Sequence, residues 1–369
     1  MYTTKPLSLF KSNPADAAAA PPPEGRHSGY LVVKGPTDDE RCFFGLFPDR
    51  RVRELPFPQD RVLKVRYTVS NGQTTSVHEE SVVFVPVPDQ PLASNRYYAV
   101  IAKGKRRGLV RACSREDDMA TCCFCRCVRD VEPRPFDPAD VYQQIQVVRR
   151  SRGWFTAKAV AADGFPYSLF RHKYWEVYAS KTKKFDLGEA LGVDAALRSR
   201  QLLADAALVP VAAAVGRWYA PFFLIKEDGV TPREQMERSA FYEVRLELGW
   251  EPVHARGGGG GGSKLASKKA LIGGCVEAKQ EALDYSRHRD EYVWFKAAAT
   301  GQRLGVCTTM WERMRWEQSR GGWVDEEEDA GKVAGGTVLV ERFVVRRLDG
   351  TVVVAFDFVH LNKVRAKQV

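Results

Sequence analysis

The stretch FYEVRLELGW, Phe241–Trp250, constrains the fold more than any other part of the chain. The side chains of one parity, from Tyr242 to Trp250, are all apolar, whereas those from Glu243 to Glu247 on the other parity are charged. Successive side chains of a β-strand point to opposite faces, so this period of two predicts a strand with one buried face. The chain must therefore contain a sheet that packs one of its faces into a core.

The N-terminal part of the chain carries shorter strand signals, which are aromatic or β-branched runs separated by Pro, Gly and Asn. These runs are Tyr30–Val33, Cys42–Leu46, Val62–Tyr67, Val82–Val85 and Tyr97–Ile101. Pro86, Pro88 and Pro91 follow the fourth run, and proline cannot donate to a central ladder, so that end is expected at a sheet edge. Strands spaced in this way predict antiparallel sheets with a sandwich or barrel-like arrangement.

Three segments predict short helices. Thr231-Pro232-Arg233-Glu234 combines an N-cap hydroxyl, a proline at the first helical position and a glutamate that completes a capping box. A second helix is expected over 187–206, where capping-box spacing precedes strong helix formers. A third begins near Thr309 and ends at Gly321-Gly322. The predicted fold class is α+β and β-dominated, with antiparallel sheets and a few short helices.

The end of the chain predicts a β-hairpin. Two apolar runs, Val338–Arg347 and Val352–His360, flank the residues Leu348-Asp349-Gly350-Thr351, and Asp-Gly is a strong signal for a tight turn. Earlier in the same half, six consecutive glycines at 257–262 precede Ser263-Lys264. A phosphate-binding P-loop requires lysine before the hydroxyl residue and a strand before the glycines, so a flexible linker is the better interpretation.

With 369 residues, the chain is long enough for two domains or for one large β-rich domain. We expect an extended lead-in at 1–27, because Ala and Pro dominate its second half. A β-rich unit is expected at 28–150, followed by an α+β unit at 151–369. The second unit would contain a flexible Gly-rich insertion at 255–268. A hydrophobic content of 44% with 28% charged residues is typical of a globular protein and not of a disordered one.

The chain is basic, with a net charge of +10 and a pI of about 9.2. This positive charge is compatible with nucleic acid or acidic lipid as a partner, but it does not by itself predict either. The local basic runs, Lys103–Arg107 and Arg149–Arg152, are short and are expected in solvated loops. The N-terminus shows no signal-peptide core, and no apolar run is long enough for a membrane-spanning helix. These features predict a cytoplasmic or nuclear protein with reduced cysteines.

The segment TCCFCRC, Thr121–Cys127, holds half of the eight cysteines. Its C-C-x-C-x-C spacing differs from the C-x₂₋₄-C spacing of structural zinc sites. In a strand, Cys123, Cys125 and Cys127 would share one face, with Cα atoms about 6.6 Å apart at each step. Buried reduced thiols are the preferred interpretation. A metal site remains an alternative, with Cys113, Cys123, Cys125 and Cys127 as candidate ligands, and so do a redox disulfide and S-acylation.

Other catalytic signatures are absent from the sequence. The six histidines are scattered without metal-ligand pairing, and no nucleophile elbow, dinucleotide fingerprint or kinase set occurs. The acidic cluster Glu116-Asp117-Asp118 is expected in an exposed turn. No cofactor is predicted, and catalytic residues remain unknown, because catalytic groups often meet only in the fold.

Long phrases of the chain resemble a family of plant proteins, the domain of unknown function numbered 1262. They include PPPEGRHSGYLVV, LPFPQDRVLKVRY, CSREDDMATCCFCRCVRDVEPRPFDPADVYQQ, GRWYAPFFLIKEDG, QMERSAFYEVRLELGWE and WERMRWEQSRGGWV. The resemblance runs along nearly the whole chain and departs from the family mainly at the polyglycine tract and the alanine-rich segments. It implies an intracellular land-plant protein without an established activity, and it supplies no catalytic residues.

Two classes of function follow from these observations. The preferred class is a non-enzymatic binding or interaction protein, with another protein as its partner. The alternative is an enzyme of unrecognised type that uses a cleft between the two units and involves Cys113, Cys123 or Cys125. A pocket with convergent ionisable groups would favour the enzyme, whereas an aromatic or basic surface would favour binding.

Overall fold

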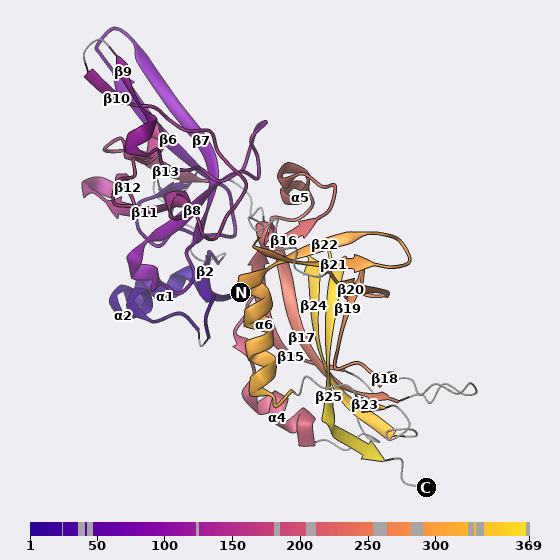
Figure 1. Ribbon diagram of the computed structural model, residues 1–369. Coiled ribbons are helices and arrows are strands. Elements are labelled where there is room, and N and C mark those ends of the chain that lie inside the picture. Colours follow the sequence, from indigo (N-terminus) through magenta and orange to yellow (C-terminus); the bar gives the residue numbers. More distant parts are fainter. Residues whose placement is uncertain are drawn as a thin grey trace. The chain divides into compact units, whose positions relative to one another are not determined.

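The computed structural model describes most of the chain, and its residues pack into two compact units (Figure 1). The described residues are 1–23, 25–35, 41–42, 47–122, 125–180, 185–203, 212–253, 264–281, 291–323, 328–329 and 336–366. Unit 1 comprises Met1, Ala190–Gly229 and Phe241–Val369, whereas unit 2 comprises Tyr2–Glu189 and Val230–Ala240. Each unit is β-dominated and carries a few short helices, which confirms the predicted fold class.

Unit 2 contains a seven-stranded sheet of order β12-β11-β8-β7-β6-β13-β5, whose strands pair in antiparallel fashion. The sheet strands are β5 (Arg51–Val52), β6 (Leu63–Ser70), β7 (Thr75–Pro86), β8 (Arg96–Ile101), β11 (Gln144–Arg149), β12 (Phe155–Ala159) and β13 (Glu176–Ala179). Smaller elements are β3 (Arg41–Cys42), β4 (Phe47–Pro48), β9 (Met119–Cys122), β10 (Cys125–Val128), α3 (Ser168–Arg171) and α5 (Pro232–Arg238). The sheet supports the core and, at its edge, the pocket described below.

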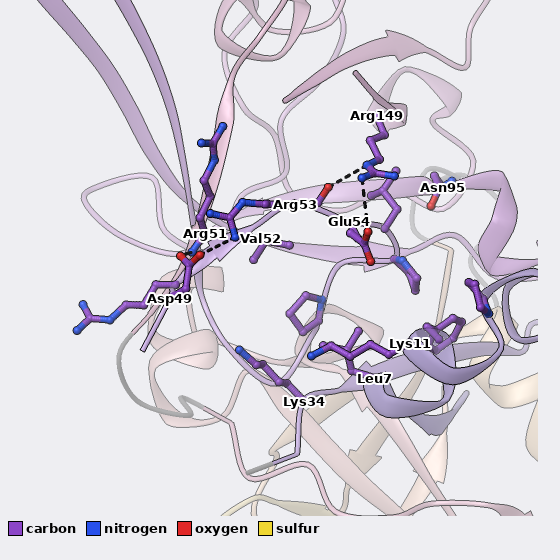
Figure 2. A pocket seen from close by; sticks show the side chains of 16 residues that line it. Leu7, Lys11, Lys34, Asp49, Arg51, Val52, Arg53, Glu54, Asn95 and Arg149 are labelled. Carbon is purple, nitrogen blue, oxygen red and sulfur yellow. Dashed lines mark hydrogen bonds and ion pairs between the residues drawn. The ribbon is translucent and has the colours of Figure 1, made fainter. Parts of the chain in front are cut away.

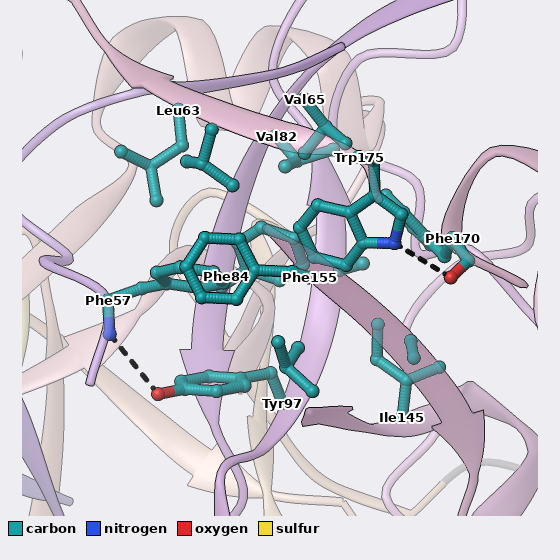
Figure 3. Close-up of a cluster of buried hydrophobic side chains, with 14 of the residues drawn as sticks. Phe57, Leu63, Val65, Val82, Phe84, Tyr97, Ile145, Phe155, Phe170 and Trp175 are labelled. Atoms are coloured by element: carbon teal, nitrogen blue, oxygen red, sulfur yellow. Dashed lines mark hydrogen bonds between the residues drawn. The ribbon is translucent and has the colours of Figure 1, made fainter. Parts of the chain in front are cut away.

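An aromatic cluster forms the core of unit 2 (Figure 3). The ring of Phe57 lies at its centre, 5.0 Å from the rings of both Phe84 and Phe155. Trp175 is fully buried, and its indole nitrogen donates to the carbonyl of Phe170 at 2.8 Å, so its one polar atom is satisfied. These side chains come from the sheet and from the loop before β6, so the core fixes that loop on the sheet.

The N-terminal segment of unit 2 is folded, whereas we expected an extended lead-in over 1–27. Its elements are β1 (Tyr2–Pro6), α1 (Leu7–Ser12), α2 (Pro14–Ala19) and β2 (Gly29–Val33), and β1 pairs with β2 in parallel. Pro14 occupies the first turn of α2, where a missing N–H costs nothing, and alanines continue the helix. Phe10 and Ala17 then bury their side chains against Val32 and Leu92.

Unit 1 contains an antiparallel sheet of order β16-β22-β21-β20-β19-β25-β24-β17-β15, with β14 paired to β15. The strands are β14 (Gly192–Val193), β15 (Ala213–Pro221), β16 (Ile225–Glu227), β17 (Phe241–Pro252), β19 (Lys268–Ile272), β20 (Val276–Gln280), β21 (Tyr292–Ala297), β22 (Arg303–Cys307), β24 (Gly336–Arg347) and β25 (Val352–Ala366). The short strands β18 (Lys264–Leu265) and β23 (Glu328–Asp329) pair separately.

Helix α6 (Thr308–Arg320) lies along one face of the unit 1 sheet (Figure 1). Its Trp311 packs against Phe295, Phe356 and Phe358 of that face, with ring centroids 5.2–5.9 Å apart. Helix α4 (Ala195–Leu203) is connected to α6 and the sheet by buried charges. The apolar contacts and the charges together determine where both helices sit on the sheet.

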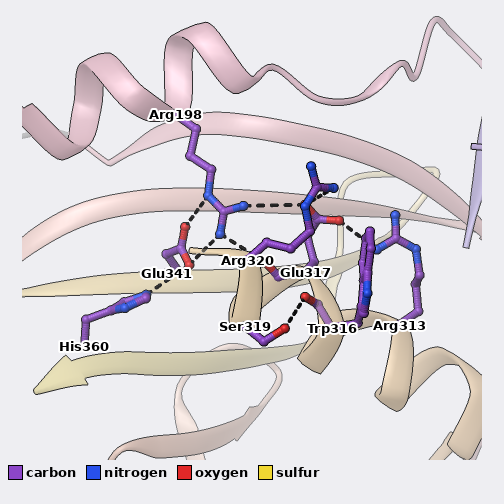
Figure 4. Close-up of polar contacts among 8 residues, drawn as sticks. All are labelled: Arg198, Arg313, Trp316, Glu317, Ser319, Arg320, Glu341 and His360. Atoms are coloured by element: carbon purple, nitrogen blue, oxygen red, sulfur yellow. Dashed lines mark hydrogen bonds and ion pairs between the residues drawn. The ribbon is translucent and has the colours of Figure 1, made fainter. Parts of the chain in front are cut away.

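Several buried charges of unit 1 form one network (Figure 4). The guanidinium of Arg198 donates two hydrogen bonds, of 2.8 and 2.9 Å, to the carboxylate of Glu341, and Nε2 of His360 lies 3.0 Å from the same carboxylate. Glu317 accepts from Arg313 at 2.7 Å and from Arg198 at 3.5 Å. Opposite charges in this network therefore lie in direct contact with one another.

The strongest local signals of the sequence are confirmed. Strand β17 alternates as predicted, with the apolar parity buried from Tyr242 to Leu248, and the terminal hairpin β24–β25 turns at Asp349-Gly350. Thr231 and Glu234 form the predicted capping box of α5. Helix α4 is shorter than expected, beginning at Ala195 instead of Leu187. The glycine tract at 257–262 lies outside the described residues.

The two compact units do not follow the expected ranges 28–150 and 151–369. Hairpin β11–β12 spans residue 150, because Arg149 of β11 pairs with Phe155 of β12. Strand β13 then pairs with β6, which binds the chain up to Ala179 into the same sheet. Pairing between strands that are distant in the sequence leaves no local sequence signal. The boundary between the two units, at Glu189–Ala190, therefore could not be predicted from the amino-acid composition.

Candidate functional site

An open pocket of about 640 Å³ lies in unit 2 (Figure 2) and is here called the cationic pocket. Its lining comes from α1 and α2, from Lys34 after β2, from the segment Asp49–Pro58, from Asn95 and from Arg149 at the end of β11. Pockets that bind small molecules generally measure about 300–1,000 Å³. The cavity is therefore large enough for a ligand of metabolite or lipid size.

The core of unit 2 positions the wall Asp49–Pro58. Gln59, which follows that wall, is fully buried, and its amide nitrogen donates to the carbonyls of Phe57 and Phe84 at 2.5 and 3.0 Å. Its amide oxygen accepts from the backbone N–H of Val32 at 2.6 Å. Because every polar atom of this side chain bonds to backbone, the segment is held between β2 and β7. The pocket is thus preformed on one side.

Basic side chains outnumber acidic ones around the cationic pocket by six to two. They are Lys11, Lys34, Arg50, Arg51, Arg53 and Arg149, against Asp49 and Glu54. Figure 2 labels all of these basic side chains except Arg50, and it shows Arg51 and Arg53 on a different wall from Lys34. The lining therefore carries an excess of positive charge, which favours an anionic ligand.

Two carboxylates hold part of this cationic lining in place. Arg53 pairs with Asp49 at 2.5 Å, and Arg149 pairs with Glu54 at 3.4 Å. Partial burial opposes ionisation of Asp49, but hydrogen bonds from the Arg51 backbone and the Arg53 guanidinium outweigh it and lower the pKa of Asp49. Arg51 is paired outside the cavity, with Glu176 at 2.7 Å. Arg50 has no ion-pair partner in the described part of the chain.

The rest of the lining of the cationic pocket is apolar. Leu7 and Phe10 contribute from α1, Pro14 begins α2, and the facing wall contributes Leu55 and Pro56. Apolar surface beside guanidinium groups suits a ligand that has an anionic group and an apolar body. We expected Arg149 only as part of a solvated basic run. The sequence could not reveal the cavity, because its lining residues lie far apart along the chain.

The cysteine cluster divides between two strands of a hairpin. Strand β9 ends at Cys122 and β10 begins at Cys125, and the antiparallel register places these two residues opposite each other. The expected single strand, with Cys123, Cys125 and Cys127 on one face, is therefore not formed. Cys123 itself lies outside the described residues, and of Cys125 only the backbone is described. The side chain of Cys127 is exposed.

Cys113, the remaining metal candidate, lies in the core cluster of unit 2, with 1% of its surface exposed. Burial, helped by the charge of Asp140, raises the pKa of its thiol to about 12. Such a thiol stays protonated at neutral pH, whereas nucleophilic or metal-binding cysteines act as thiolates. Within the described ranges, no three His, Cys, Asp or Glu side chains are arranged to hold a metal ion. The cysteine sites remain predictions.

Among the helices that the structure describes, none is both long enough and apolar enough to cross a bilayer. The other notable basic run, Lys103–Arg107, forms the turn after β8, as expected of a loop. Arg107 of this run pairs with Glu237 of α5 at 3.3 Å and also donates to the carbonyl of Met236. The guanidinium group of Arg107 thus holds this turn against α5.

Comparison with known proteins finds a family model that matches a segment in the N-terminal part of the chain. No curated protein matches the sequence. A solved structure, titled "Crystal structure of Cry35Ab1", is 9% identical with a TM-score of 0.43, and the alignment covers 84% of this chain and 90% of that chain. Likeness of this degree says nothing about function. Residues 24–124 match the family described as "Protein of unknown function (DUF1262)", which confirms the expected resemblance over that segment.

Proposed function

We propose that the protein is a non-enzymatic binding protein whose unit 2 binds an amphipathic anion in the cationic pocket. The observation that carries this proposal is the lining, which combines six basic side chains with apolar ones in a cavity of about 640 Å³. Guanidinium groups bind carboxylate and phosphate oxygens through paired hydrogen bonds. The resemblance to a plant family supports an intracellular plant setting as part of the same proposal.

The apolar body of the ligand would lie against α1 and the segment Leu55–Pro58. Both Phe10, which is almost fully buried, and Leu7, which is half-buried, line the pocket. Burial of apolar surface contributes about 25 cal/mol per Å². A hydrocarbon chain or an aromatic ring therefore adds affinity that a bare inorganic anion lacks.

A dansylated fatty acid is a suitable probe, because its fluorescence rises when it leaves water. Leu7→Trp fills part of the pocket and should weaken binding at least about tenfold, an energy of roughly 1.4 kcal/mol. Leu9→Trp is the matched control, since Leu9 lies on the same helix but is exposed and does not line the pocket. Arg149→Gln should also weaken binding, whereas Lys158→Gln, an exposed cation on β12, should not.

The same titration can contradict the proposal in two ways. If Leu7→Trp and Leu9→Trp bind the probe equally well, the ligand does not enter the cationic pocket. If the wild-type protein chemically converts a bound ligand, the enzyme alternative replaces the binding role. Circular dichroism of each variant establishes that lost binding does not reflect lost folding.

A further inference from the structure

A second cavity of unit 2 has a lining that differs from that of the cationic pocket. It measures about 270 Å³, and four basic side chains line it, namely Arg50, Lys64, Arg66 and Lys103. The other described lining residues are Val62, Ser81, Tyr178, Ala179 and Ser180, so none of the described lining side chains is a carboxylate. From this lining we infer a second binding site, for a phosphate group, here called the phosphate pocket.

The register of the sheet builds the phosphate pocket. Tyr178, Lys64 and Ser81 lie directly opposite one another on the neighbouring strands β13, β6 and β7. Arg66 is two residues beyond Lys64 on the same strand and therefore shares its face. Leu63 and Val65, on the opposite face, belong to the buried core. Lys64 and Arg66 thus project from a sheet whose other face is packed, while Lys103 comes from the turn after β8 and Arg50 directly precedes β5.

The charges at this site suit a tetrahedral dianion. Four cations within one small cavity can donate several charge-assisted hydrogen bonds to phosphate oxygens. The volume is below the usual range for drug-sized ligands, so a single phosphate or pyrophosphate group fits better than a large molecule. Burial and the hydrogen bond to Glu176 raise the pKa of Tyr178, which keeps its hydroxyl protonated beside the site. No phenolate charge then opposes the anion.

The carboxylate of Glu79 competes with a bound phosphate for two of the basic side chains of the phosphate pocket. Its carboxylate pairs with Lys64 at 3.0 Å and with Arg66 at 2.5 Å, and these two hydrogen bonds lower the pKa of Glu79. A bound phosphate must therefore draw these two cations away from Glu79. Removal of this carboxylate should strengthen phosphate binding, which is a prediction specific to this site.

Isothermal titration of the full-length protein with inorganic pyrophosphate tests the inference. Lys103→Gln and Arg66→Gln should each weaken binding about tenfold, whereas the matched control Lys158→Gln, on β12 of the same unit, should leave it unchanged. Glu79→Gln should tighten binding several-fold. Glu277→Gln, an exposed carboxylate of unit 1, changes the net charge equally and should have no comparable effect. Arg50 is left intact because it lines both cavities.

The outcomes decide the inference and identify the source of the phosphate. Absence of binding to the wild type, or equal affinities for Lys103→Gln and Lys158→Gln, would overturn it. If Arg66→Gln fails to fold, Lys103→Gln still tests the site from an exposed turn. Co-sedimentation with phosphatidylcholine vesicles, with and without a phosphatidylinositol phosphate, separates a lipid headgroup from a soluble phosphate. Leu7 lines only the cationic pocket and Lys103 only the phosphate pocket, so the two proposals fail independently.

Discussion

Gly108 shows at the scale of one residue how closely α5 packs in unit 2. Its φ of +84° lies in the left-handed region, and a Cβ added there would collide with the backbone carbonyl of Pro232. Gly104 has nearly the same φ, +82°, but nothing lies within 4 Å of an added Cβ. Gly108→Ala should therefore lower the free energy of unfolding by about 1–3 kcal/mol more than Gly104→Ala, as measured by urea denaturation. Equal losses of unfolding free energy in the two variants would show that α5 can shift away from residue 108 at little cost.

Cys113 couples the stability of unit 2 to alkaline pH. Burial, followed by the charge of Asp140, raises the pKa of its thiol from 9.0 to about 12. The folded state thus keeps the proton that the unfolded chain releases, so its stabilising contribution is complete below about pH 9 and is lost as the pH rises toward about 12. The difference in unfolding free energy between wild type and Cys113→Ala should shrink above about pH 9, by up to about 1.4 kcal/mol per unit. A difference that stays constant up to about pH 11 would contradict this assignment.

At the scale of elements, buried charges hold α4 and α6 on the unit 1 sheet. Arg198 is only 8% exposed, and its partner Glu341 is fully buried. Arg198→Met should leave Glu341 without its main counter-charge and lower the free energy of unfolding by about 3–5 kcal/mol. Arg233→Met breaks the exposed pair with Glu237 and should cost about 1 kcal/mol or less. Urea denaturation of both variants measures the contrast, and similar losses would show that the network contributes no more than a surface pair.

The elements that the sequence predicts well are those set by neighbouring residues. Three signals depend on residues only a few positions apart: the capping box at Thr231 and Glu234, the alternation of β17 and the Asp-Gly turn. Each of them therefore predicts the local structure correctly. The folded segment 2–19 could not be predicted in this way. Its helices are short, and their stability comes from the burial of Phe10 and Ala17 by residues distant in the sequence.

The candidate sites belong to the scale of the whole molecule, which explains why the sequence alone did not reveal them. The cationic pocket combines segments near residues 7, 34, 49 and 149, and the phosphate pocket joins three strands with the turn after β8. Neither set has a motif spacing, because each depends on strand order. The cysteine cluster, by contrast, is conspicuous in the sequence, yet the register places Cys122 opposite Cys125 across a hairpin and provides no described metal site.

The chain contributes to unit 2 twice, because Val230–Ala240 joins it between two segments of unit 1. Met236 of this segment is 3% exposed, so Met236→Ala should remove about 2–5 kcal/mol of packing free energy from unit 2. Regions unfold locally according to their own stability, so hydrogen exchange should accelerate around Arg107–Arg111 while β17 and β24 of unit 1 keep their protection. Arg238→Ala, on the exposed side of α5, is the control and should leave both regions unchanged. Equal acceleration in β17 and β24 would mean that the two units unfold as one cooperative body.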